Sequence, residues 1–281
     1  MQQSPICAMP SRVRQLSQSG KTYDILCFSH LRWDFVFQRP QHLLSRFARN
    51  GRVFFWEEPR YTEARAEARL DVRVDKATGV TVIVPELPTG LGAQTEQLML
   101  EGLLDRFVIE QRMHCLVRWY YTPMMMPFSA HLSADCTVYD CMDELSAFRN
   151  APPGLLALEE RLLREADVVF TGGYSLYEAK RNRHPNVHAF PSSVDVAHFA
   201  QARTALSEPE DQAAIPHPRL GFFGVVDERM DIELLGALAD AKPDWSLVVL
   251  GPVVKIDPAD LPQRANIHYL GAREYSALPA Y

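Results

Sequence analysis

Residues 25–42 read ILCFSHLRWDFVFQRPQH and join an apolar run to a polar loop and then to the start of a helix. The run Ile25–Phe28 predicts a buried strand. Pro40 suits the first turn of a helix that Gly51 would end. A buried strand followed by a polar loop and a helix start is where open α/β proteins bind ligands. The loop holds more charged and polar side chains than packing requires, so it predicts a ligand site.

The alternation of strand and helix patterns continues along the whole chain. Apolar runs predict strands at 23–28, 53–56, 70–74, 80–84, 115–120, 137–139, 167–170, 187–190, 220–223, 246–250 and 266–270. Helical patterns lie at 40–50, 94–113, 155–165, 175–183 and 232–241, and 274–281 begins another. Strands that alternate with helices predict βαβ units and a mostly parallel sheet.

Bulk properties exclude several classes of protein. The chain has 281 residues, 47% of them hydrophobic, and a formal net charge of -6, which argues against a general nucleic-acid binder. No apolar run approaches the roughly 20 residues of a membrane span, and residues 1–20 lack the apolar core of a secretory signal. The five cysteines contain no Cys-x-x-Cys pair, so we expect reduced thiols, no zinc site and a cytoplasmic location.

Composition divides the chain into four parts. We expect a flexible tail at 1–20, a complete N-terminal Rossmann-like domain at 21–199 and a polar, proline-punctuated linker at 200–218. Residues 219–281 restart the strand-helix pattern with three predicted strands, whereas a complete nucleotide-binding domain needs about five or six. We therefore expect a partial C-terminal domain. The alternative is a small three-stranded appendage that packs on the first domain.

Three segments together resemble one family of enzymes. They are the loop and helix start from Trp33 to Leu44, the segment FPSSVDVAHF at 190–199, and the run from Leu220 to Gly271 with its strand-glycine repeats. Their order and spacing are similar to the GT-B fold glycosyltransferases of the group 1/family 4-like set. The resemblance covers about residues 22–281 and implies an α/β protein with two Rossmann-like domains, the second one partial.

The resemblance also implies how the chemistry is divided. In that family the C-terminal domain holds a nucleotide-sugar donor and the N-terminal domain holds the acceptor, with no obligatory metal or other cofactor. A nucleoside diphosphate leaves with developing negative charge, which arginines and backbone N–H groups can stabilise.

The donor side is predicted from the loop after the strand at 220–223. Gly224 stands where the family places a glycine turn near the donor phosphates, although an ordinary tight turn is the alternative. The family commonly has an arginine directly after this glycine, but Val225 occupies that position here. Arg229 is the nearest cation in the loop, so we expect Gly224 and Arg229 to bind the donor.

Two carboxylates are candidates for the reacting centre. Asp143 and Glu144 follow the strand at 137–139, and carboxylates at the carboxyl edge of a parallel sheet face the ligand crevice. The equally weighted alternative is that the Asp caps the next short helix.

The acceptor side is predicted from the loop at 29–42. His30 ends the first strand, Arg39 precedes Pro40 at a helix start that can gather anions, and Trp33 is placed to stack on a sugar ring. Structural roles are the alternatives, a satisfied histidine for His30 and core packing for Trp33. The methionines at 124–126 could contact a lipid acceptor, but packing on the N-terminal domain is the favoured interpretation.

The functional expectation is a glycosyltransferase that moves a sugar from a nucleotide sugar to a saccharide or lipid-linked acceptor in polysaccharide or cell-envelope synthesis. A lipid-linked acceptor would bring the protein to the inner membrane face. The alternative is a catalytically inactive, truncated form that acts as a sugar- or partner-binding module. Val225 and the partial second domain support the alternative.

Overall fold

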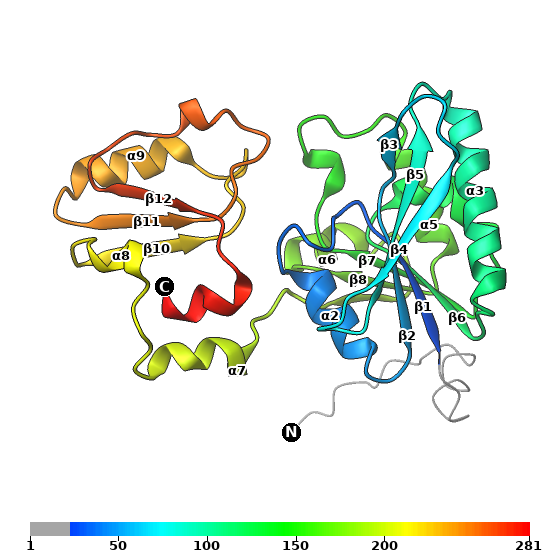
Figure 1. The fold of residues 1–281 in the computed structure, drawn as a ribbon, viewed down its shortest axis with the longest axis horizontal. Helices are drawn as coiled ribbons and strands as arrows, with labels where there is room; N and C mark the ends of the chain where they lie inside the picture. Colours follow the sequence, from blue (N-terminus) through cyan, green and yellow to red (C-terminus); the bar gives the residue numbers. More distant parts are fainter. Residues whose placement is uncertain (1–22) are drawn as a thin grey trace. The chain divides into compact units, whose positions relative to one another are not determined.

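The structure is a computed structural model that describes residues 23–281, so the tail predicted at 1–20 lies outside the described residues. The chain divides into two compact units, residues 1–192 and 193–281, of which the first is described from residue 23 (Figure 1). Each unit is an α/β structure built on its own sheet.

The first unit holds one nine-stranded sheet in the order β3-β5-β2-β1-β6-β7-β8-β9, with β4 paired to β5. Its strands are β1 (Asp24–Phe28), β2 (Arg52–Trp56), β3 (Arg60–Thr62), β4 (Arg69–Val74), β5 (Thr81–Pro88), β6 (Leu116–Tyr120), β7 (Cys136–Cys141), β8 (Val168–Thr171) and β9 (Val187–Ala189). Its helices are α2 (Arg39–Phe47), α3 (Ala93–Glu110), η1 (Pro123–Met125), α4 (Met126–Ser129), η2 (Leu145–Ala147), α5 (Leu155–Glu165) and α6 (Tyr174–Lys180). All pairs except β4–β5 are parallel, which confirms the predicted sheet.

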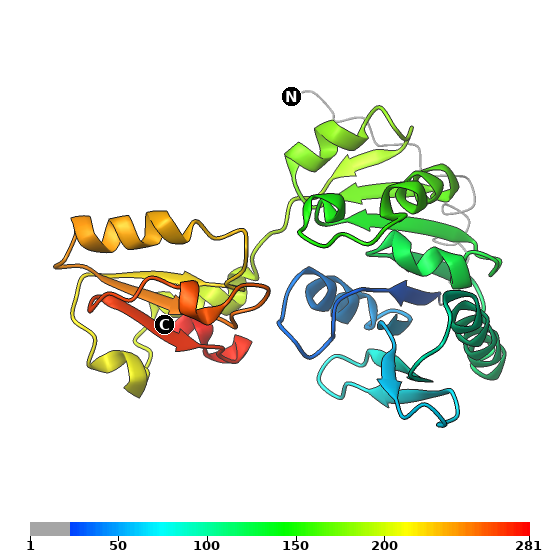
Figure 2. The same cartoon turned by 90° about the horizontal axis from the view of Figure 1, so that it is seen from above.

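Cores lie on both faces of this sheet. Side chains of β1 alternate between them, with Leu26 and Phe28 on one face and Ile25 and Cys27 on the other. The first face is covered by α3, α4 and α5, and the second by α2 and the loop that follows β1. Figure 2 shows α3 and α2 on opposite sides of β1. Burial on both faces explains why every residue of β1 is buried.

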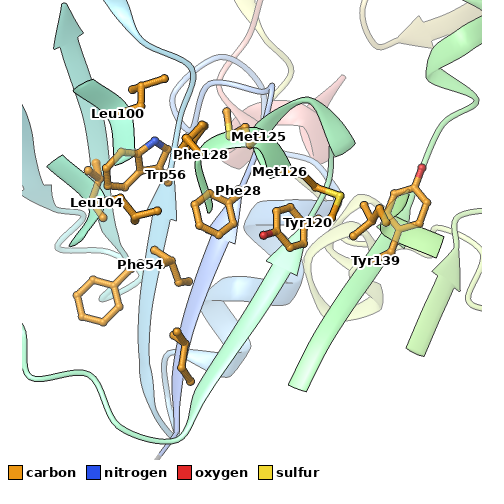
Figure 3. Close-up of a cluster of buried hydrophobic side chains, with 14 of the residues drawn as sticks. Phe28, Phe54, Trp56, Leu100, Leu104, Tyr120, Met125, Met126, Phe128 and Tyr139 are labelled. Atoms are coloured by element: carbon orange, nitrogen blue, oxygen red, sulfur yellow. The ribbon is translucent and has the colours of Figure 1, made fainter. Parts of the chain in front are cut away.

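The methionine-rich loop belongs to the first of these cores. Met125 and Met126 are buried, and Figure 3 shows them in the same cluster as Phe28, Tyr120 and Phe128. The Phe28 and Tyr120 rings stack with their centroids 5.0 Å apart. The favoured interpretation, packing on the N-terminal domain, is confirmed for Met125 and Met126, whereas Met124 is half-buried.

The second unit holds a three-stranded parallel sheet in the order β10-β11-β12. Its elements are α7 (Val196–Phe199), η3 (Ala200–Arg203), α8 (Glu210–Ala213), β10 (Arg219–Phe223), α9 (Ile232–Ala241), β11 (Ser246–Leu250), η4 (Pro258–Asp260), β12 (Ile267–Gly271) and η5 (Tyr275–Ala280). Figure 2 shows α9 on one side of the sheet and η5 on the other. The three predicted strands are present, and the predicted C-terminal helix is the 3-10 helix η5.

The division between the units comes earlier than residue 199, the predicted end of the first domain. It follows Ser192, and residues 200–218 include helical turns that pack within the second unit. His198 stacks on Tyr275 with ring centroids 4.3 Å apart, and Phe199 stacks on Phe223 at 5.6 Å. These stacking contacts, together with the burial of Ile215 against Val248 and Leu250, therefore tie the polar stretch to the second unit, where it does not act as a free linker.

The outer edge of β10 is apolar and exposed. Leu220, Phe222 and Phe223 are 38%, 41% and 56% exposed, whereas every residue of the neighbouring β11 is buried. An unpaired, apolar edge strand favours association. We expect the 281-residue chain to associate as its concentration rises, and Phe222→Lys to weaken that association, as measured by light scattering. Leu234→Lys, at an exposed position on α9, is the control that should behave like the wild type. A wild-type chain that stays monomeric at all concentrations would contradict this expectation.

Within residues 23–281, the helices are all too short or too polar to cross a membrane.

Candidate functional site

The carboxyl ends of β1 and β6 mark the topological switch point of the first sheet, where the order of the strands reverses. From β1 the chain continues to β2 on one side and later to β6 on the other. Ligands of open α/β sheets bind at such a switch point. His30 lies here, half-buried, directly after β1, while the N–H of Tyr121 donates to the Phe28 carbonyl at 2.9 Å. The structure thus places His30 where the sequence predicted it, at the sheet edge that suits a ligand.

The loop after β1 is anchored by one buried carboxylate, that of Glu57. The N–H of Trp33 donates to Glu57 Oε1 at 2.8 Å, and Arg32 donates to Glu57 Oε2 at 3.0 Å. Glu57 is buried directly after β2. The amide of Gln41 donates to the Trp33 carbonyl at 2.7 Å and ties the loop to α2. These bonds preorganise the segment that carries His30.

Trp33 is part of the core, so its predicted role as a sugar-stacking residue is wrong. Its ring is 5% exposed, meets Phe55 edge-on at 5.0 Å, and donates through Nε1 to Asp75 Oδ2 at 2.9 Å. The alternative of core packing is confirmed. The ring lies between Phe55 on β2 and Asp75 in the turn between β4 and β5. Burial of this large apolar ring stabilises the folded protein.

Trp33→Phe tests this assignment. Partial burial alone would raise the pKa of Asp75, but hydrogen bonds from Trp33, Thr78 and the Ala77 N–H outweigh burial and lower it. We expect the variant to lose about 1–2 kcal/mol of unfolding free energy through the lost hydrogen bond and packing, as measured by urea denaturation. The loss should be full above the ordinary pKa of Asp75, and it should shrink only as the pH falls below that value and through the lowered pKa of the folded state, where the carboxylate is protonated. If Trp33→Phe kept the stability of the wild type but bound glycans more weakly, Trp33 would be a ligand-binding residue and not a core residue.

Arg39 serves mainly to neutralise a buried carboxylate. Its Nη2 lies 2.8 Å from Asp140 Oδ1, its Nε donates to both Asp140 oxygens at 3.0 and 3.1 Å, and its Nη1 donates to the Phe190 carbonyl at 2.6 Å. Asp140 is the penultimate residue of β7 and has no exposed surface. The predicted role of Arg39 in acceptor binding is therefore not supported, because most of its donors are committed within the protein.

Asp140 is the residue that the sequence analysis left out of the site. Its pKa is raised by burial, against the opposing effect of Arg39. Tyr121 lies beside it, and burial together with the Asp140 charge raises the pKa of Tyr121 well above its usual value. The signal that could have marked Asp140 is its position inside a fully buried strand, where an acidic residue needs a cation.

The two predicted catalytic carboxylates have different surroundings. Both are partly buried in the turn that follows β7. Glu144 pairs with the buried Lys180 at 3.0 Å and accepts a hydrogen bond from Ser146 at 2.9 Å. Burial alone would raise its pKa, but these partners outweigh burial and lower it. Glu144 is therefore engaged in a structural pair, and Asp143 remains the candidate for the reacting centre.

In the second unit three glycines lie at the carboxyl ends of the three strands, Gly224 after β10, Gly251 after β11 and Gly271 as the last residue of β12. The N–H of Gly224 donates to the Leu250 carbonyl at 3.0 Å, and that of Gly251 donates to the Gly271 carbonyl at 2.9 Å. A Cβ on Gly251 would lie 1.6 Å from the Gly224 oxygen, so no side chain fits there. The ends of β10 and β11 therefore pack backbone against backbone at Gly251, while the Phe222 ring lies 3.3 Å from where a Cβ on Gly224 would be. Glycines at such an edge let a ligand approach the backbone closely.

Two cations lie in the loops beyond these glycines. Arg229 donates to Asp227 through Nε and Nη2, with a closest distance of 2.7 Å, and keeps 54% of its side chain exposed. Lys255, which the sequence analysis missed, is 53% exposed and lies 3.9 Å from Glu228. Hydrogen bonds between Val226 and residues Pro252 and Val254 join the two loops. The carboxylates offset part of the positive charge that a donor diphosphate would meet.

The start of α9 is already occupied. Asp231 caps it by accepting the Leu234 N–H at 2.8 Å. A phosphate would therefore be held by the glycine turns and the loop cations, and not by this helix dipole. Among residues 23–281, no cluster of His, Cys, Asp and Glu has the form of a metal site.

Comparisons with known proteins bear on the fold. In sequence, the chain matches no protein-family model and no curated protein. In structure it is similar to HepE from Anabaena in complex with UDP and glucose, with a TM-score of 0.60 and 14% identity over 91% of this chain and 70% of that one. It is also similar to an alpha,alpha-trehalose-phosphate synthase (UDP-forming) from Burkholderia xenovorans in complex with glucose-6-phosphate, with a TM-score of 0.58 and 11% identity over 92% and 76%.

A third solved structure, from E. coli and described as trehalose-6-phosphate bound with UDP-2-fluoro glucose, has a TM-score of 0.59 and 11% identity over 91% of this chain and 75% of that one. At such low identity the likeness concerns the fold alone. These neighbours are GT-B glycosyltransferases, and the resemblance noted in the sequence is confirmed at this level. The chain has the α/β fold of the GT-B glycosyltransferases.

Proposed function

We propose that the protein is a glycosyltransferase that takes a sugar from a nucleotide-sugar donor. The second unit holds the donor at its glycine edge, and the first unit holds the acceptor at the carboxyl edge of its sheet. The acceptor is a saccharide or a lipid-linked glycan, as in polysaccharide or cell-envelope synthesis, and the protein works in the cytoplasm or at the inner membrane face.

The observation that carries this proposal is the row of glycines, Gly224, Gly251 and Gly271, at the carboxyl ends of the three strands. In a parallel sheet this edge is the usual place for a ligand, and here the tight approach at Gly251 excludes any side chain. Structures with the same fold bind UDP with glucose or a fluorinated UDP-glucose. Together these facts support a nucleoside diphosphate as the ligand of the second unit.

The chemistry follows from the groups available. An acceptor hydroxyl attacks the anomeric carbon of the donor, the bond from that carbon to the diphosphate oxygen breaks, and the diphosphate leaves with the bonding electrons. Arg229 and Lys255 offset the charge that develops on the departing group. Asp143 is our candidate for the base that accepts the proton the hydroxyl loses. No step in this scheme requires a metal ion.

Titration calorimetry with UDP, GDP, UDP-glucose and GDP-mannose tests the proposal. We expect binding of at least one of these ligands to the full chain, and weaker binding to Arg229→Met, which removes the cation but leaves the backbone turns intact. Gly221→Ala is a matched control because a Cβ there has open space. No heat with any of the four ligands would contradict the proposal.

The second candidate is a sugar- or partner-binding module without activity. It is favoured by Asp227 and Glu228, which partly neutralise the cations of the donor loops. A chain that binds a glycan, binds no nucleotide and hydrolyses no nucleotide sugar would establish this function instead.

A further inference from the structure

A cluster of buried charges lies under the loop that carries Asp143. At its centre Lys180, the last residue of α6, is only 1% exposed. Its Nζ lies 2.8 and 2.9 Å from the two carboxylate oxygens of Glu159 on α5, and 3.0 Å from Glu144 Oε2. One ammonium group thus joins two helices to the loop after β7.

The Lys180–Glu159 pair is complete without the loop. Glu159 is buried and also accepts the Tyr139 hydroxyl at 2.9 Å and Arg183 Nη1 at 3.1 Å. Four hydrogen bonds from three residues therefore already satisfy this carboxylate. The additional contact to Glu144 reaches the half-exposed end of the cluster, where an ion pair adds little to stability. What this contact does add is a fixed position for the loop.

The charge states suit this arrangement. Burial alone would lower the pKa of Lys180, but its bonds to Glu159 and Glu144 outweigh burial and raise it. The pKa of Glu144 is lowered by the same partner. Both groups are therefore ionised at neutral pH, and the bond between them is charge-assisted.

The loop is anchored on its other side by β8. The N–H of Gly172 donates to the Cys141 carbonyl at 2.9 Å, and a Cβ on Gly172 would lie 2.7 Å from the Met142 carbonyl oxygen. The Cys141 thiol lies 3.5 Å from the Asp143 carbonyl oxygen. Asp143 is thus the residue between two anchors, the glycine contact before it and the Glu144–Lys180 pair after it.

We propose that Lys180 is a positioning residue, which holds Glu144 and thereby fixes the loop at residues 142–148 and the orientation of Asp143. Glu144 is then part of the support and does not touch the substrate. The consequence for catalysis rests on the proposed function, whereas the consequence for the loop does not.

Hydrogen exchange followed by mass spectrometry tests the position of the loop. Glu144→Met removes the acceptor but leaves Lys180 paired with Glu159, so the protein should still fold. We expect amides of 142–148 to exchange roughly tenfold faster, the change produced by losing about one charge-assisted hydrogen bond, while α5 and α6 keep their protection. Glu144→Gln retains a carbonyl acceptor and should restore part of the protection. Glu160→Gln, at an exposed position on the same helix as Glu159, should match the wild type.

Two results would overturn the proposal. One is unchanged exchange of the loop in Glu144→Met, and the other is a loosening of α5 and α6 together with the loop, which would mean a general structural role. For catalysis, hydrolysis of UDP-glucose should show a lower kcat with an unchanged KM in Glu144→Met, and a wild-type kcat in that variant would remove the catalytic consequence. If the wild type neither binds nor hydrolyses any nucleotide sugar, the proposed function fails, and the exchange result still decides the position of the loop.

Discussion

Gly251→Ala should unfold the second unit under conditions in which the first unit stays folded. The backbone at Gly251 has φ 141°, and a Cβ would lie 1.6 Å from the Gly224 carbonyl oxygen, so two adjacent strand ends would have to separate. We expect a loss of about 3 kcal/mol or more of unfolding free energy, since strain and a backbone clash combine. That is a large share of the total for a unit as small as residues 193–281.

Hydrogen exchange resolved along the chain measures this effect, because it reports on the two units separately. Gly221→Ala is the matched control, since it adds the same methyl group to β10 where a Cβ meets nothing within 4 Å. Protection of β11 and β12 should be lost in the first variant and kept in the second. Gly251→Ala should also lose nucleotide binding, because the folded second unit is needed for it. Wild-type protection in Gly251→Ala would show that the glycine edge can open without cost, and would remove the main support for a built donor site.

Arg39→Met should destabilise the first unit by about 3–5 kcal/mol, because it leaves Asp140 as a buried carboxylate without its cation. The pKa of Asp140 is already raised by burial and would rise further without Arg39. A carboxyl group with a raised pKa binds its proton more tightly in the folded state, so protonation favours folding. The deficit of the variant should therefore be largest at neutral pH and should shrink as the pH falls toward the ordinary value of an aspartate.

Urea denaturation across this pH range, with the double variant Arg39→Met/Asp140→Asn, separates charge from packing. The double variant should recover most of the lost stability at neutral pH, because the buried charge is gone. Arg161→Met provides a control at an exposed ion pair and should change stability by less than about 1 kcal/mol. A deficit that does not depend on pH would show that Arg39 acts through packing and that Asp140 does not govern its role.

Most elements of the fold could be predicted because their signals are local. Residues 247–250 form an unbroken apolar run before a glycine, and the structure has a fully buried strand over Ser246–Leu250. The sequence analysis missed β3 (Arg60–Thr62), since three residues without an apolar pattern form a strand only by pairing with β5. Residues 200–218 looked like a linker because their composition is polar. The aromatic contacts of His198 and Phe199, directly before them, form only in the folded chain and leave no local pattern.

Site residues were harder to predict, because their roles depend on partners far away in the chain. His30 lies at the expected sheet edge, and Gly224 lies at the expected glycine turn. Arg39 and Glu144 were candidates for ligand contact, yet each is paired with an ionised residue that no local pattern connects to it. Trp33 looked like a stacking platform, and only burial showed that its ring belongs to the core.

The sequence by itself determined the α/β class, the two-part organisation and the positions of the strand ends, since apolar runs, glycines and prolines act through the local backbone. The tertiary structure alone decided which polar side chains remain available for a ligand. Asp140 and Arg39 are 101 residues apart, and Glu144 and Lys180 are 36 apart. Such pairs arise because a buried charge must find its counter-charge wherever the fold brings one near, and that requirement leaves no trace in the spacing of the sequence.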